Sequence, residues 1–169
     1  MRLLVTLAFT AFLMTGVVGA QEQQPAASPL PTASPSSVSH KAGMTMPKGW
    51  IPAPGDTVAK FVYRSPTAPQ DIRVAPVAAA KELTGEQGMK TVREMMARFK
   101  TWQADVTQTM VCNATEPAIL SIAKDAKGQT VMEQVIVVGT TGGAIVTYEI
   151  GDGHPDPQAE SALRSICVP

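Results

Sequence analysis

The sequence has little of what most active sites use. It contains only two histidines, His40 and His154, and only two cysteines, Cys112 and Cys167. It has no nucleophile-elbow motif, phosphate-binding loop, dinucleotide fingerprint or zinc-protease helix. Enzymes without a histidine base exist, but paired carboxylates would then need a cleft to act in. We therefore expect a protein that is not an enzyme, and we assign no catalytic residue.

Charge is also scarce and balanced. Charged residues make up 17% of the chain, with 14 basic and 14 acidic side chains. Nucleic-acid binding favours a clearly basic surface, so a nucleic-acid partner is not expected. Residues 41–100 nevertheless hold ten basic and five acidic side chains, whereas residues 101–169 hold three and eight. This asymmetry indicates either a charged binding face or two solvated surfaces that complement each other.

The first 20 residues are typical of a secretory signal. Arg2 precedes an apolar run, which ends in the small residues Val18, Gly19 and Ala20. The run is shorter than the roughly 20 residues that span a bilayer, and four polar residues follow it. We predict cleavage after Ala20, no membrane span in the mature chain, and a secreted or periplasmic location.

Residues 21–45 are rich in proline, serine and alanine and have few large apolar side chains. Such a segment buries too little surface to offset the entropy lost on ordering, and its prolines favour extended chain. We predict that residues 21–45 form a disordered linker and that residues 46–169 form one domain, which we expect to be a monomer.

Cys112 and Cys167 are predicted to form one structural disulfide, the usual outcome for two cysteines in an exported chain. The bridge would close a loop of about 55 residues, which the chain-entropy model values at about 4 kcal/mol. No histidine lies at a spacing that would complete a zinc site with these thiols.

The hydrophobic pattern predicts an α+β domain. We expect two strands near residues 57–64 and 71–76, a helix, a four-strand meander over residues 106–150, and a closing helix. Antiparallel pairing follows from the short turns, and both helices should pack on the twisted sheet. The apolar run 135–138 predicts a central strand, buried on both faces. Pro76 predicts that the second strand lies at a sheet edge.

Both helices have recognisable starts. Thr84 and Gln87 have the spacing of a capping box at the start of the first. Asp156 followed by Pro157 predicts the cap of the second. The first helix should present one apolar arc, formed by Met89, Val92, Met95, Met96, Phe99 and Trp102.

Residues 46–169 resemble the PsbP-like domains of small exported proteins. The resemblance rests on Pro47-Lys48-Gly49-Trp50 at the domain start, the strand pair before an amphipathic helix, Ile145-Val146-Thr147-Tyr148, and the closing helix after Asp156-Pro157. It implies a non-enzymatic binding or accessory role. It does not imply a photosynthetic role, and it supplies no binding residues.

Three clusters are candidate sites. His40, Met44 and Met46 could bind Cu(I) through soft ligands, although Met46 could instead pack at the domain edge. The loop 151–157 offers Asp152, Asp156 and His154 to a divalent cation, but the same residues suit a turn and a helix cap.

The third cluster is the solvent-facing side of the first predicted helix. It could dock an acidic partner or be an ordinary solvated surface, and its residues are Lys90, Arg93, Arg98 and Lys100. We expect an exported interaction or accessory module whose partner is a protein or envelope component. A copper-binding envelope protein is the alternative.

Overall fold

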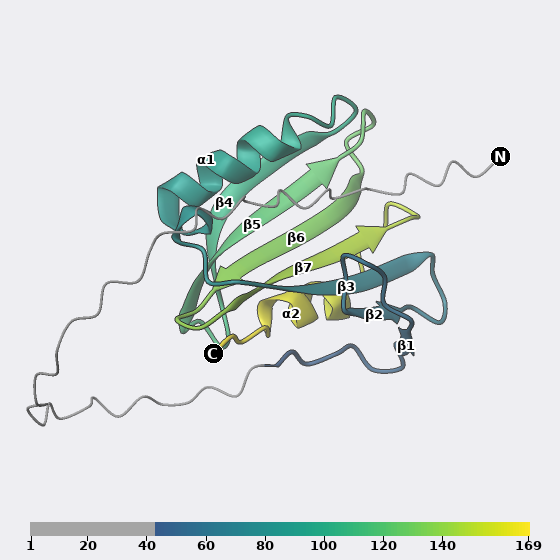
Figure 1. The fold of residues 1–169 in the computed structure, drawn as a ribbon. Coiled ribbons are helices and arrows are strands. Elements are labelled where there is room, and N and C mark those ends of the chain that lie inside the picture. Colours follow the sequence, from purple (N-terminus) through teal and green to yellow (C-terminus); the bar gives the residue numbers. More distant parts are fainter. Residues whose placement is uncertain (1–42) are drawn as a thin grey trace, which may run out of the picture. The chain divides into compact units, whose positions relative to one another are not determined.

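The computed structural model describes residues 43–169 (Figure 1). The predicted signal, most of the predicted linker and His40 lie outside the described residues. The described part contains one seven-stranded antiparallel sheet in the order β1-β2-β3-β7-β6-β5-β4. Its strands are β1 (Ile51–Ala53), β2 (Phe61–Arg64), β3 (Gln70–Val77), β4 (Gln103–Val111), β5 (Glu116–Lys124), β6 (Thr130–Val138) and β7 (Gly143–Ile150).

Two α-helices cover opposite faces of this sheet. Helix α1 (Gly85–Met96) follows a short 3₁₀ turn, Lys81–Leu83, and packs on β4 and β5. Helix α2 (Pro157–Arg164) packs on β6 and β7. Alternate residues of β6 face the two helices, because Ile136 belongs to the α1 cluster while Val135 and Val137 belong to the α2 cluster. We call these two surfaces the α1 face and the α2 face.

The α1 face is covered by helix and by the turn that follows it. Val92 and Met96 of α1 pack with Ile119 and Ile136 of the sheet. Gly88 permits this close approach, since a Cβ there would lie 2.7 Å from Ile119 Cδ1. After the helix ends, two aromatic rings stack 5.2 Å apart and pack on the same cluster; they are Phe99 and Trp102.

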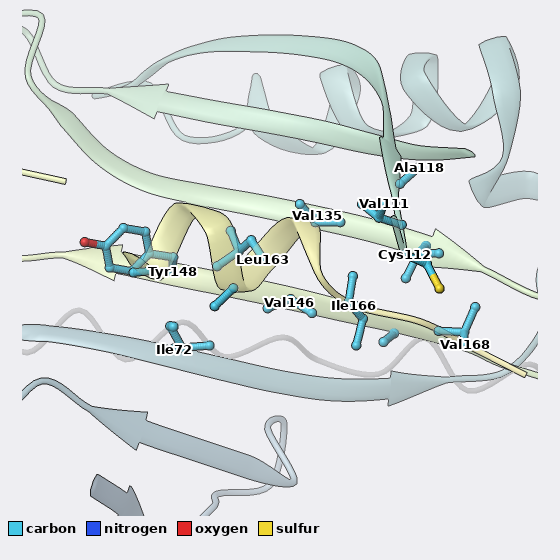
Figure 2. Close-up of a cluster of buried hydrophobic side chains, with 14 of the residues drawn as sticks. Ile72, Val111, Cys112, Ala118, Val135, Val146, Tyr148, Leu163, Ile166 and Val168 are labelled. Carbon is cyan, nitrogen blue, oxygen red and sulfur yellow. The ribbon is translucent and has the colours of Figure 1, made fainter. Parts of the chain in front are cut away.

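The α2 face contains the larger buried cluster (Figure 2). Leu163 lies against Val135 and Val146, while Tyr148 fills the end of the cluster beside the start of α2. The ring of Trp50 meets that of Tyr148 edge-on at 6.1 Å. This face is thus closed by α2 and by the chain segments near both ends of the domain.

The predicted fold class is confirmed, including the meander β4–β7 and the central position of β6. The structure adds β1, a three-residue strand that contains Pro52 and has no alternating pattern. Its neighbour β2 begins at Phe61, four residues later than the predicted strand.

The prediction that the strand with Pro76 lies at an edge was wrong, because β3 lies between β2 and β7. Pro76 is accommodated because β2 pairs only with residues Asp71–Val74 of β3. Pro76 therefore lies where β3 has extended past this neighbour, so that the missing N–H costs less than in a doubly paired position.

The first helix is shorter than predicted and starts differently. It ends at Met96, so Arg98 and Lys100 follow the helix rather than belonging to it. Thr84 is the N-cap residue, but its hydroxyl donates to the carbonyl of Lys81 and caps no helical N–H. The second helix begins as predicted, with the Asp156 carboxylate accepting from the Gln158 N–H at 2.8 Å.

Candidate functional site

An apolar cavity of about 500 Å³ lies on the α2 face of the described domain. Three strands form its floor, and chain segments near both ends of the domain form its walls. Its lining residues are Gly43, Met44, Met46, Phe61, Tyr63, Val74, Pro76, Val77, Gly142, Gly143, Ala144, Ile166, Cys167, Val168 and Pro169. Its size falls in the range of roughly 300–1,000 Å³ that is usual for ligand pockets.

The floor follows from strand register. Phe61 of β2 pairs with Val74 of β3, and Val74 pairs with Val146 of β7. Tyr63, Pro76 and Ala144 share this face because side chains alternate along each strand. Helix α2 packs on β6 and β7, so extended chain rather than helix lies over the outer part of the floor.

One wall is the tail that follows α2, residues Ser165–Pro169. The Cys112–Cys167 disulfide joins this tail to the end of β4, which confirms the predicted bridge. The N–H groups of Gly43 and Cys167 donate to each other's carbonyls at 3.1 and 2.8 Å. The Val168 N–H donates to the Glu116 carboxylate at 3.2 Å. The backbone bonds between Gly43 and Cys167 join the tail to the neighbouring segment 43–46, which also lines the cavity.

No charged side chain is part of the lining. The Nζ of Lys60 lies 5.4 Å from the centroid of the Phe61 ring. Phe61 is 48% exposed although it lines the cavity, so this part of the cavity opens to solvent. The site can therefore hold an apolar group.

A buried polar network fixes the other end of the α2 face. The Tyr148 hydroxyl donates to the Gln70 side-chain oxygen at 2.7 Å and accepts from the Asp156 N–H at 2.7 Å. Burial raises the pKa of Tyr148 to about 12, so the phenol stays protonated and able to donate. The amide nitrogen of Gln70 donates to the Asp152 carboxylate and to the carbonyl of His154.

Polar groups of loop 151–157 therefore already form hydrogen bonds within the fold. The hydrogen bond from Gln70 and that from the His154 N–H lower the pKa of Asp152. Asp156 caps α2. These contacts match the turn-and-cap interpretation, which was the alternative to a divalent-cation site.

From Gly43 onward, one group of three potential metal-ligating side chains lies close together: Cys112, Glu116 and Cys167. Its two sulfurs form the disulfide and are not thiolates. The methionines of the predicted copper cluster, Met44 and Met46, both line the apolar cavity and pack against the α2-face cluster.

All four predicted basic residues are exposed, but they do not form one helical face. Arg93 donates to the carbonyl of Val106 at 3.1 Å, a structural bond to the edge strand β4. In the described part of the chain, no acidic side chain pairs with any of the four. The available positive surface thus consists of Lys90 on α1 and of Arg98 and Lys100 beyond its end.

Ion pairs cover the part of the α1 face that α1 leaves open. Arg73 lies 2.7 Å from Asp56 and 3.4 Å from Glu149, and Arg64 lies 3.4 Å from Asp71. Burial raises the pKa of Glu149, although Arg73 opposes that rise. Sequence reasoning missed these pairs and the cavity, because both depend on which strands become neighbours. The alternation of Phe61 and Tyr63 was the one local signal for the cavity floor.

No helix in the described residues is long and apolar enough to span a membrane. Comparison with protein-family models gives no match for this chain, and comparison with curated proteins gives none either. The geometry of the described domain is thus what points to a function.

Proposed function

We propose that this protein is an exported, non-catalytic accessory module that binds an apolar group of its ligand or partner in the cavity on the α2 face. The observation that carries the proposal is the cavity itself, with about 500 Å³ of space lined by residues whose side chains carry no charge. The disulfide supports an oxidising compartment, in agreement with the secretory signal expected in residues 1–20. The PsbP-like resemblance also supports an accessory role.

Binding of an apolar fluorescent probe to the purified mature protein tests this proposal. Filling the cavity would remove apolar surface of the probe and of Phe61 from water. We expect saturable binding, and we expect Phe61→Ser to weaken it about tenfold, since roughly 1.4 kcal/mol of lost burial corresponds to that factor.

Met110→Ser is the matched control. Met110 is 47% exposed, close to the 48% of Phe61, but it does not line the cavity. This variant should bind the probe like the wild type. Absence of saturable binding, or an equal loss in both variants, would contradict the proposal.

A second surface could serve the same accessory role. Lys90, Arg98 and Lys100 are exposed and free of ion pairs within the described residues, so they could steer an acidic partner to the domain. Charge reversal at Lys90 and Lys100 should then remove partners that co-purify with the native protein. Unchanged partners would show that this surface is only solvated.

The copper alternative rests on the two thioethers of Met44 and Met46, which line the same cavity. If the protein binds Cu(I), Met44→Leu combined with Met46→Leu should lower its affinity in competition with a chelator. Leucine keeps the lining apolar, so binding of the apolar probe should survive in this variant. If the double variant keeps the wild-type affinity for Cu(I), Met44 and Met46 are not copper ligands.

A further inference from the structure

The contacts around the cavity opening narrow the chemistry of the ligand. Phe61 is part of the lining and is half exposed, and the Lys60 amine lies over its ring. A ligand that fills the cavity and extends past the exposed edge of Phe61 can therefore bring a polar end toward this amine.

Lys60 is available to a ligand. Among the residues from Gly43 onward, its amine forms no ion pair with an acidic side chain. The nearby Asp56 is already engaged, since its carboxylate pairs with Arg73 at 2.7 Å and accepts the N–H groups of Val58 and Ala59. Charge complementarity thus favours an anionic group at this opening.

The interior favours an alkyl chain over a peptide. A peptide would bring backbone N–H and C=O groups into a space whose lining is mainly apolar. A buried polar group without a partner is costly, whereas an alkyl chain has none. Met44 and Met46 add flexible, unbranched side chains that adapt to such a chain.

We propose that the ligand is a free long-chain fatty acid, with its alkyl chain in the α2-face cavity and its carboxylate beside Lys60. This inference rests on the proposed function. The alkyl chain supplies most of the affinity through burial of apolar surface. The carboxylate supplies a smaller preference, because an ion pair at an exposed opening is weak.

A comparison of a fluorescent fatty acid with the alcohol of the same chain length tests the proposal on the full mature protein. We expect the wild type to bind the acid about two- to fivefold more tightly than the alcohol, the range that an exposed ion pair supplies. Lys60→Gln should reduce this ratio to about one and leave the affinity for the alcohol unchanged. Lys60→Glu should reverse the preference.

Lys127→Gln is the control, because Lys127 is exposed in the β5–β6 turn and does not line the cavity. It should keep the wild-type ratio. Thermal melts of every variant verify that the fold is intact.

The outcomes separate the two proposals. If neither amphiphile binds, the cavity is not a binding site and the proposed function fails as well. If the wild type binds acid and alcohol equally, or Lys60→Gln keeps the preference, the fatty-acid proposal fails while cavity binding stands. Binding to anionic vesicles without binding of the free acid would also overturn it, because the surface would then recognise a membrane.

Discussion

The two faces of the sheet are packed by different kinds of structure. On the α1 face, a 12-residue helix and the stacked Phe99 and Trp102 fill the space over β4, β5 and β6. On the α2 face, an eight-residue helix packs on β6 and β7, and the extended segments 43–46 and 166–169 line the cavity together with residues of β2, β3 and β7. The cavity lies under the extended segments, so binding is expected where packing is incomplete.

Removing the disulfide should have the largest effect and should act on the α2 face. We expect Cys112→Ser with Cys167→Ser to lower the free energy of unfolding by about 4 kcal/mol, the value for a closed loop of this length. The tail that forms one wall would lose its covalent link, so probe binding should weaken as well. Urea titration and probe titration measure the two effects. If the double variant binds the probe as tightly as the wild type, the hydrogen bonds of the tail to Gly43 and Glu116 are enough to hold this wall in place.

Replacing a methionine by alanine should lower the free energy of unfolding more on the α1 face than beside the cavity. Met96 is buried in the α1 cluster, so we expect Met96→Ala to cost about 2–5 kcal/mol through lost burial and a new void. Met46 is half-buried and already borders open space, and Met46→Ala should cost less than about 2 kcal/mol. Denaturant melts of both variants measure this difference. Equal costs would mean that the two faces are packed equally well.

The smallest effect should come from a buried acid on the α2 face. Glu133 of β6 is buried near Glu160 and Arg164 of α2. Burial, followed by repulsion from Glu160, raises the pKa of Glu133 above its ordinary 4.5, although Arg164 opposes the rise. Because the folded state holds this proton more tightly, the contribution of Glu133 is most favourable below pH 4.5. It is lost as the pH rises through the raised pKa.

Glu133→Gln should therefore stabilise the domain at neutral pH and flatten this part of the stability profile. Thermal melts at several pH values between about 4 and 8 test the prediction, since this window spans the ordinary and the raised pKa. Arg164→Gln is an informative comparison. It removes the positive charge that opposes the rise in the pKa of Glu133, so it should make the melting temperature depend more steeply on pH. A wild-type profile in Glu133→Gln would contradict the assignment.

Several elements could be predicted because their signals are local. Val146, Tyr148 and Ile150 alternate with more polar residues and are, together with Ala144, the buried side chains of β7. Asp156 caps α2 by a bond to a residue two positions away. The run Val135–Val138 was expected to be a central strand, and β6 has neighbours on both sides.

Other elements were missed because tertiary contacts override the local pattern. The apolar arc continues past Met96 to Phe99 and Trp102, with no glycine or proline to end the helix. The chain nevertheless turns there, and the two rings stack on the sheet cluster instead of extending α1. Likewise β1 has no alternation of its own and depends on pairing with β2.

The sequence by itself determined the fold class, the disulfide pair and the start of the closing helix, because each depends on neighbouring residues or on having only two cysteines. The tertiary structure alone decided the cavity. Met44, Phe61 and Val168 are far apart in the chain and meet only when the sheet, the bridged segments and the tail come together. No local pattern encodes such a meeting, because it depends on the pairing of distant strands.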